Sequence, residues 1–191
     1  MLVTLATRTF TPEPTAAALR LGALARALAA GGDRVRVLTS RLARSVARDA
    51  RRLADGGVDA GEDSGLVEVR RAPVLRDRTG AVRGYVSYMS FDLPLLARLL
   101  TGPRPDVVVS EPPPTTGAAV RIACAVRRVP YVYYCADIVS DAAALAGVPG
   151  LVVRTVAGLE SFALRGARRV IAVSDGVARR ARDLGAHDVA V

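Results

Sequence analysis

The sequence predicts an α/β protein built on a doubly wound parallel sheet with helices on both faces. Short apolar runs rich in valine and other β-branched residues recur along the chain, and a stretch with helical periodicity separates each run from the next. Several runs are continuously apolar rather than alternating, as expected for parallel strands that helices cover on both faces. This alternation of strand and helix is typical of a parallel, Rossmann-like α/β sheet.

The first half of the chain gives three strands and three helices. The apolar run Leu2–Ala6 predicts the first strand, and the Ala/Leu-rich residues 15–30 predict the next helix, which Gly31-Gly32 ends in the usual way. Further strands are expected at 34–39 and 66–70, and further helices at 41–54 and 86–101. The glycine- and aspartate-rich residues 55–65 predict a flexible surface loop.

The second half repeats the pattern. Strands are expected at 106–110, directly after Pro103 and Pro105, and at 130–135 and 169–173. Helices are expected at 115–128, 151–166 and 175–184, the last with a capping sequence at its start. The chain stops at residues 188–191 in what looks like another strand, so we expect a fragment or a dissected domain.

Length and composition indicate one well-buried domain, residues 1–191. Half of the residues are hydrophobic, and no apolar run approaches the roughly 20 residues that a membrane span needs. The N-terminus lacks the layout of a signal peptide, which favours a cytoplasmic location. Cys124 and Cys135 lie in apolar stretches and the only histidine is His187, so we expect no metal site and no disulfide, and two small core cysteines.

The net charge of +9 comes entirely from arginine, because the chain has no lysine. It has two interpretations: a compositional bias of the source genome, or attraction to polyanions or an anionic membrane surface. Aromatic residues make up 4% of the chain and do not alternate with the arginines. Nucleic-acid binding by base stacking is therefore not favoured.

Ligands of open α/β sheets bind at the carboxyl ends of the strands. The segments that follow the predicted strands there are 9–16, 110–117, 136–141 and 174–176. The first contains Pro12-Glu-Pro-Thr15 where a nicotinamide-dependent enzyme would carry a Gly-x-Gly-x-x-Gly loop, so that class is rejected.

Four stretches, in order, resemble family-4 retaining glycosyltransferases of the GT-B fold. These are the loop, helix and strand at 10–39, Pro105–Pro113, Arg128–Asp137, and Leu159–Ser174. The resemblance implies the N-terminal, acceptor-side half of such an enzyme, similar to those that build exopolysaccharides such as colanic acid. The C-terminal half, absent from this chain, would hold a UDP- or GDP-sugar donor. The fragment itself would bind no cofactor and transfer no sugar, and the acceptor would be a sugar or a lipid-linked glycan.

The resemblance also suggests site residues. Asp137 is the candidate catalytic residue, since it matches a position near the reacting sugar, although it could instead cap the following helix. Asp141, four residues on, is a second polar contact or ordinary surface. The other candidate substrate-binding residues are the corner Pro14-Thr15-Ala16, where the helix start offers backbone N–H groups, Glu111 and Pro112, lining the cleft, and Ser174, which reaches the cleft or caps a helix.

Two surface features favour a peripheral position at the inner face of the cell membrane. Arg41, Arg44, Arg48 and Arg52 recur every three or four residues, and an aromatic and aliphatic segment follows at 84–100. The alternative is a solvated helix face and a core helix. A polyanion- or membrane-binding module without catalysis is accordingly the second hypothesis for the function.

Overall fold

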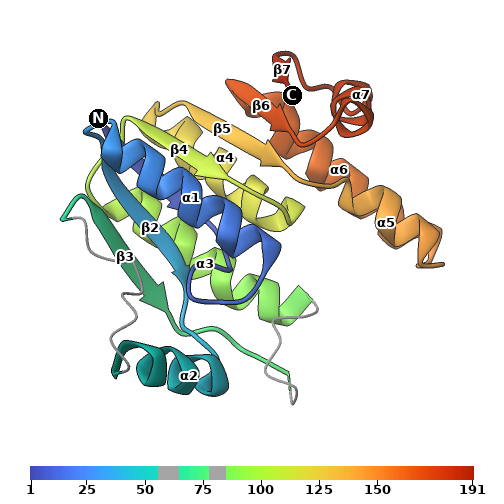
Figure 1. The fold of residues 1–191 in the computed structure, drawn as a ribbon. Helices are drawn as coiled ribbons and strands as arrows, with labels where there is room; N and C mark the ends of the chain where they lie inside the picture. Colours follow the sequence, from blue (N-terminus) through green and yellow to red (C-terminus); the bar gives the residue numbers. More distant parts are fainter. Residues whose placement is uncertain (56–64, 78–84) are drawn as a thin grey trace. The chain divides into compact units, whose positions relative to one another are not determined.

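The computed structural model describes residues 1–55, 65–77 and 85–191, which form two compact units, Met1–Pro94 and Leu95–Val191 (Figure 1). We call them the N-terminal and the C-terminal unit. Helix α3 (Tyr85–Thr101) runs through the boundary and contains Pro94. Most of the predicted loop at 55–65 lies outside the described residues.

The N-terminal unit contains a parallel sheet in the order β3-β2-β1. Its strands are β1 (Leu2–Ala6), β2 (Arg34–Ser40) and β3 (Val67–Ala72), and its helices are α1 (Ala16–Ala30), α2 (Arg44–Asp55) and the first part of α3. In the register of the sheet Leu5 lies opposite Val37, and Val37 opposite Val69. Leu5 and Val37 are fully buried, so β1 and β2 form the centre of this core.

The C-terminal unit contains a parallel sheet in the order β4-β5-β6-β7. Its strands are β4 (Val107–Ser110), β5 (Tyr131–Cys135), β6 (Arg169–Ala172) and β7 (Val189–Ala190). Its helices, besides the end of α3, are α4 (Pro114–Arg127), α5 (Val139–Leu145), α6 (Gly150–Gly166) and α7 (Asp175–Asp183). The strand expected at 188–191 is present as β7.

The predicted α/β, Rossmann-like class is confirmed. The orders 3-2-1 and 4-5-6 are those of the two halves of the Rossmann fold. All predicted strands and helices occur among the described residues, with shifted ends. Helix α2 begins at Arg44 rather than at residue 41, because the backbone N–H of Arg41 still donates to the Ala72 carbonyl and prolongs the β2–β3 ladder. Helix α5 was not among the predicted helices.

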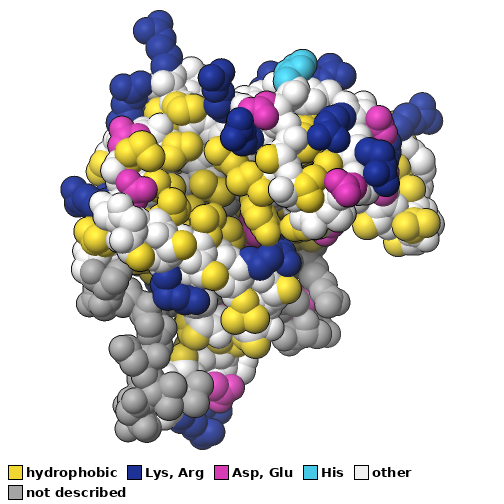
Figure 2. Space-filling model, turned by 45° about the horizontal axis from the view of Figure 1, so that its top comes forward, with side chains coloured by type: hydrophobic (Ala, Val, Ile, Leu, Met, Phe, Trp, Pro, Cys, Tyr) yellow, Lys and Arg dark blue, Asp and Glu magenta, His cyan; other side chains and the backbone are white. Residues whose placement is uncertain are grey.

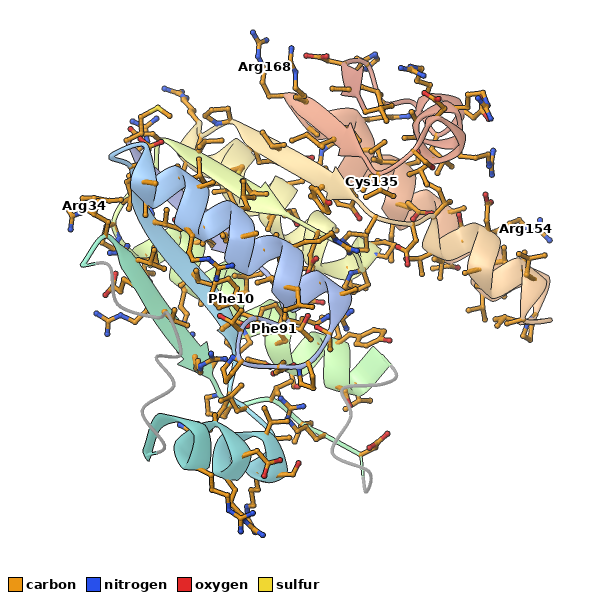
Figure 3. The ribbon with its side chains drawn as sticks, viewed as in Figure 1. Phe10, Arg34, Phe91, Cys135, Arg154 and Arg168 are labelled. Carbon is orange, nitrogen blue, oxygen red and sulfur yellow. The ribbon has the colours of Figure 1, made fainter. Side chains whose placement is uncertain are left out.

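Both cysteines are core residues, as predicted. Cys124 on α4 and Cys135 on β5 are buried free thiols, and burial raises the pKa of each to about 12. Beside them, α4 approaches β5 and α6 closely at Gly117. A Cβ atom there would lie 2.6 Å from the Tyr133 ring and 2.8 Å from the Ala163 methyl group, so the contact requires glycine. Figure 3 labels Cys135, together with Phe10 and Phe91, which are buried in the N-terminal unit.

The surface is rich in arginine. Figure 2 shows the dark blue arginines scattered over the visible face rather than gathered in one patch. Helix α3 is a core helix along one side, where Phe91, Leu95 and Leu99 are buried, whereas Val86 and Leu93 are exposed. Across residues 1–55, 65–77 and 85–191, no helix has both the length and the apolar character to cross a membrane.

Candidate functional site

The loop after β1 is fixed by short-range hydrogen bonds. The Thr7 hydroxyl donates to the Thr9 carbonyl over 2.8 Å and accepts from the Thr9 N–H over 3.2 Å. From the neighbouring strand β2, the Ser40 hydroxyl donates to the carbonyl of Arg8 over 2.7 Å. The first loop predicted to contact a ligand is therefore anchored to the carboxyl end of β2.

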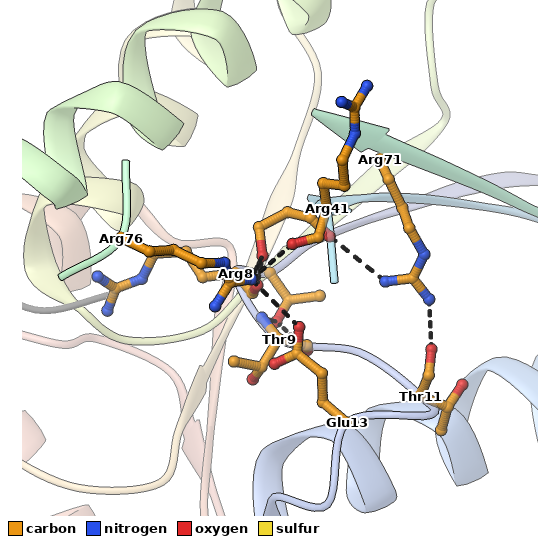
Figure 4. Close-up of polar contacts among 9 residues, drawn as sticks. Arg8, Thr9, Thr11, Glu13, Arg41, Arg71 and Arg76 are labelled. Atoms are coloured by element: carbon orange, nitrogen blue, oxygen red, sulfur yellow. Dashed lines mark hydrogen bonds and ion pairs between the residues drawn. The ribbon is translucent and has the colours of Figure 1, made fainter. Parts of the chain in front are cut away.

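Two arginines from β3 and the segment after it hold the same loop (Figure 4). Arg71 donates to the Thr11 carbonyl over 2.5 Å and to the Ser40 carbonyl over 3.3 Å. Arg76 donates to the Arg41 carbonyl over 2.5 Å and to the Ser40 hydroxyl over 3.2 Å. Because these acceptors lie on the first loop and at the end of β2, the two guanidinium groups tie three strand ends together. We call Arg71 and Arg76 the arginine clamp.

Glu13 lies inside this arrangement. Its side chain is only 9% exposed, and its carboxylate lies 3.7 Å from the Arg76 guanidinium. Burial raises the pKa of the Glu13 carboxyl above its ordinary value, against the opposing effect of the positive charges of Arg76 and Arg71. Sequence reasoning assigned no role to Glu13 or to the clamp. The only signal was a glutamate between two prolines, and nothing local identifies its arginine partners.

The predicted residues Pro14, Thr15 and Ala16 lie at the start of α1. The Thr15 side chain accepts a hydrogen bond from the Ala18 N–H over 3.1 Å and is the N-cap of the helix. Pro14 and Ala16 are exposed. The three residues thus form an accessible helix N-terminus at the carboxyl end of β1, and their contact with a substrate remains a prediction.

Arg8 extends from the end of β1 to α3. Its guanidinium carbon lies 3.9 Å from the centroid of the Tyr88 ring, within the range of a cation–π contact. With the clamp, three arginine side chains therefore surround the first loop of the N-terminal unit.

In the C-terminal unit, three predicted residues follow three neighbouring strands. Glu111 comes after β4, Asp137 after β5 and Ser174 after β6, at the carboxyl edge of one parallel sheet. Glu111 is buried, and Pro112 beside it is half-buried and leads into α4, which begins at Pro114 as proline at a first helical turn allows. Asp137 is exposed, and its carbonyl accepts a weak hydrogen bond from the Cys135 thiol.

Tyr133 is a buried tyrosine close to the acidic groups that follow β4 and β5. Tyr133 is fully buried on β5, and its hydroxyl makes no hydrogen bond with any residue that the structure describes. Its pKa is raised well above the ordinary value, first by burial and then by the nearby groups Cys135, Glu160, Asp137 and Glu111. Because β4 and β5 are parallel neighbours, Asp137 and Glu111 lie at the same edge of the sheet.

The alternative that Asp137 caps the following helix is wrong. The N-cap residue of α5 is Ile138, and the capping carboxylate belongs to Glu160 of α6. Glu160 is 1% exposed and accepts hydrogen bonds from the Val139 N–H, the Ser140 N–H and the Ser140 hydroxyl over 2.8, 3.2 and 2.6 Å. Sequence reasoning missed this role of Glu160, because its partners lie about twenty residues away.

The other two candidates are engaged in local structure. Both carboxylate oxygens of Asp141 accept hydrogen bonds from Arg180, over 2.8 and 2.7 Å, and this pairing lowers the pKa of Asp141. Arg180 also binds Asp183 on α7. Any contact of Asp141 with a substrate would have to compete with this guanidinium. Ser174 is the N-cap of α7, as the alternative for it predicted, and accepts from the Val177 N–H over 3.3 Å.

The arrangement has the features of a ligand-binding α/β sheet, and the sequence profile of the glycosyl transferase 4-like domain matches residues 15–191. The chain belongs to this family. No curated protein sequence matches this glycosyl transferase 4-like chain.

Solved structures share the fold. Alr3699/HepE from Anabaena, in complex with UDP, superposes with a TM-score of 0.59 and 18% identity, over 99% of this chain and 43% of that one. UGT89C1 from Arabidopsis thaliana, complexed with UDP-L-rhamnose, superposes with a TM-score of 0.59 and 12% identity, over 98% of this chain and 50% of that one. A putative UDP-N-acetylglucosamine 2-epimerase from Listeria monocytogenes superposes with a TM-score of 0.55 and 12% identity, over 98% of this chain and 44% of that one.

These likenesses confirm the GT-B type of fold for this glycosyl transferase 4-like domain. The chain spans half or less of the length of each of the three proteins. Their UDP and UDP-sugar complexes describe those proteins.

Proposed function

We propose that the protein is a glycosyltransferase that moves a sugar from a nucleotide-sugar donor to a glycan or lipid-linked acceptor, and that this chain is its acceptor-side domain. The observation that carries the proposal is the family match over residues 15–191. A second domain would hold the donor, since the chain covers 43% of the HepE chain and 50% of the UGT89C1 chain. We therefore expect residues 1–191 alone to transfer no sugar.

The donor would be a UDP-sugar, with a GDP-sugar as the second choice. Two of the similar structures, HepE with UDP-glucose and UGT89C1 with UDP-L-rhamnose, hold uridine nucleotides with a sugar attached. The likeness to exopolysaccharide enzymes favours a glycan acceptor and retention of configuration at the anomeric carbon. The location would be the cytoplasm, at the inner face of the cell membrane.

Asp137 is the proposed catalytic residue. Its exposed carboxylate at the end of β5 would orient an acceptor hydroxyl or stabilise the positive charge that develops at the anomeric carbon. Glu111, Pro112 and Ser174 would line the acceptor side. At the end of β1, the corner formed by Pro14, Thr15 and Ala16 would contact a phosphate or an acceptor oxygen. Its N–H donor would be that of Ala16, because proline has no N–H and the Thr15 N–H donates to the Glu13 carbonyl.

The test is transfer from a panel of UDP- and GDP-sugars to a membrane lipid extract. The full-length gene product is compared with its Asp137→Ala variant, its Asp49→Ala variant and the isolated 191-residue chain. Asp49 is exposed on α2 and serves as the matched control. We expect transfer by the full-length protein and by Asp49→Ala only. Equal activity of Asp137→Ala would remove Asp137 from the mechanism, and activity of the isolated chain would refute the need for a second domain.

A polyanion-binding module without catalysis is the second candidate, because the net charge is +9. It predicts binding to heparin that weakens steeply with salt. Absence of both product and nucleotide release with every donor, together with such binding, would favour it.

A further inference from the structure

The connection between α5 and α6 is an exposed apolar segment. Residues Ala142–Val153, which we call the α5–α6 tip, contain twelve residues and no charged, aromatic or hydroxyl side chain. Leu145 is 91% exposed and Leu151 is 75% exposed, more than any other leucine that the structure describes. The tip projects away from β5 and β6 of its own unit (Figure 1), and Figure 2 shows hydrophobic side chains on the right, where Figure 1 places it.

The tip is ordered by its own backbone. The N–H groups of Ala146, Gly147 and Val148 donate to carbonyls of α5, and those of Val152 and Val153 donate to the Pro149 carbonyl. Gly147 has a φ of 71°, which lets the chain turn between the two helices. Paired N–H groups matter, because an apolar medium penalises every backbone donor left unpaired. The turn between α5 and α6 is therefore held by its own backbone hydrogen bonds.

The charges around the tip favour an anionic partner. From residue 142 to residue 159 the sequence has a single charged side chain, that of Arg154. The next acidic residue, Glu160, is buried and its carboxylate caps α5. Arg154 is exposed on the first turn of α6, next to the tip (Figure 3). On the other side of the tip, Arg180 neutralises Asp141. Apolar side chains beside an exposed arginine are the composition of an interfacial membrane anchor.

A protein partner fits these residues less well. Protein interfaces are enriched in Tyr, Trp, Phe and Met, and the tip has none of them. Small aliphatic side chains with internally bonded backbone suit the boundary between lipid headgroups and acyl chains. The net charge of +9 adds a long-range attraction to an anionic bilayer.

We propose that the α5–α6 tip docks on an anionic membrane, with Leu145 and Leu151 buried at the headgroup boundary and Arg154 on a lipid phosphate. The inference deepens the proposed function, because α5 begins two residues after Asp137 and the docked tip holds the end of β5 near a lipid-linked acceptor. This surface differs from the predicted arginine stripe of α2 and the aliphatic segment of α3.

A tryptophan scan tests the docking directly. The chain contains no tryptophan, so Leu145→Trp introduces a unique fluorophore. The matched control is Val126→Trp, since Val126 is 69% exposed on α4 of the same unit. We expect the emission of Leu145→Trp to shift to the blue with phosphatidylglycerol/phosphatidylcholine vesicles and to be quenched by brominated acyl chains, and that of Val126→Trp to do neither. Equal responses of the two variants, or none, would overturn the proposal.

Vesicle cosedimentation of leucine and arginine variants measures how much each side chain contributes to membrane binding. Transfer of a leucine side chain from water to an apolar medium raises a partition coefficient about tenfold. We therefore expect the double variant Leu145→Ser/Leu151→Ser to bind vesicles at least about tenfold more weakly in cosedimentation. Val126→Ser is the control. Arg154→Glu should weaken vesicle binding about fivefold or more. Arg34→Glu, which changes the net charge by the same amount away from the tip, is its control and should weaken binding by less. Unchanged cosedimentation of the double variant, with native far-UV circular dichroism, would refute docking by the tip.

The remaining outcomes are distinct. A concentration-dependent dimer that the double leucine variant abolishes, without vesicle binding, would assign the tip to a second copy and overturn the proposal. Vesicle binding needs no sugar transfer. If the chain binds vesicles but the full-length protein transfers no sugar, the proposed function is refuted and the docking stands. If the full-length protein transfers sugar but the chain does not bind vesicles, the docking is refuted and the proposed function stands.

Discussion

Replacement of Glu160 tests whether one buried carboxylate holds the start of α5. Glu160 is 1% exposed and accepts three hydrogen bonds, from the Val139 N–H, the Ser140 N–H and the Ser140 hydroxyl. A hydrogen bond to a charged group contributes about 1.5–3 kcal/mol, and the donors left behind lose their partner in the interior. Because the three bonds share one group, their losses do not add, and we expect Glu160→Ala to lower the free energy of unfolding by about 3–5 kcal/mol. Glu160→Gln keeps one carbonyl oxygen and should cost about 1.5–3 kcal/mol.

The assay is urea denaturation at neutral pH, followed by far-UV circular dichroism. The control is Glu68→Ala, because Glu68 is 40% exposed and binds Arg36 and Arg70 at the surface, where an ion pair is worth about 1 kcal/mol or less. Hydrogen exchange at the Val139 and Ser140 amides should also accelerate in Glu160→Ala. A loss no larger than that of Glu68→Ala would refute the capping role.

Three further predictions concern buried groups. Because the pKa of Glu13 is raised on folding, its contribution to stability is fully present below the ordinary value of 4.5 and is lost as pH rises through the raised pKa. In urea titrations, Glu13→Gln should therefore gain stability relative to the native chain as pH rises from 4.5 through the raised pKa, with no further gain above it. Parallel pH profiles of the two proteins would contradict this. Tyr133→Phe should leave the free energy of unfolding unchanged or raise it by about 1 kcal/mol, since the hydroxyl has no partner among the described residues. Tyr133→Ala should lower it by about 3–5 kcal/mol. A clear loss of stability in Tyr133→Phe would show that the hydroxyl makes a hydrogen bond. Cys124 and Cys135, with pKa values of about 12, should react with iodoacetamide far more slowly in the native chain than in urea at mildly alkaline pH, and equal rates would refute their burial.

The strands could be predicted because burial on both faces leaves a strong local signal. The run Val107–Val109 has no polar residue and became part of β4, and the apolar run at 130–135 became β5. Helix ends with local signals were also predictable. Thr15 caps α1 through its own side chain, and Gly32 has the positive φ of 86° that follows a helix end. In each case the residues that decide the structure are neighbours in the sequence.

Helix α5 lacked such a signal. Its seven residues are too few to show a period, and its N-cap residue, Ile138, has no side-chain acceptor. The acceptor comes from Glu160, in the middle of another helix. The arginine clamp has the same character, because Arg71 and Arg76 bind carbonyl groups some thirty to sixty residues away. Such partners exist only once the strands have been placed.

The same distinction decides what can be said of the candidate site. The rule that ligands gather at the carboxyl ends of parallel strands predicted the places of Asp137 and Asp141 equally well, since the two lie four residues apart after β5. Their partners separate them. Arg180 binds both oxygens of Asp141 and holds the pKa of that carboxyl low, whereas Asp137 is exposed at the strand end and is not the helix cap. No guanidinium among the residues that the structure describes binds the Asp137 carboxylate, so Asp137 is the carboxylate whose replacement tests the chemistry.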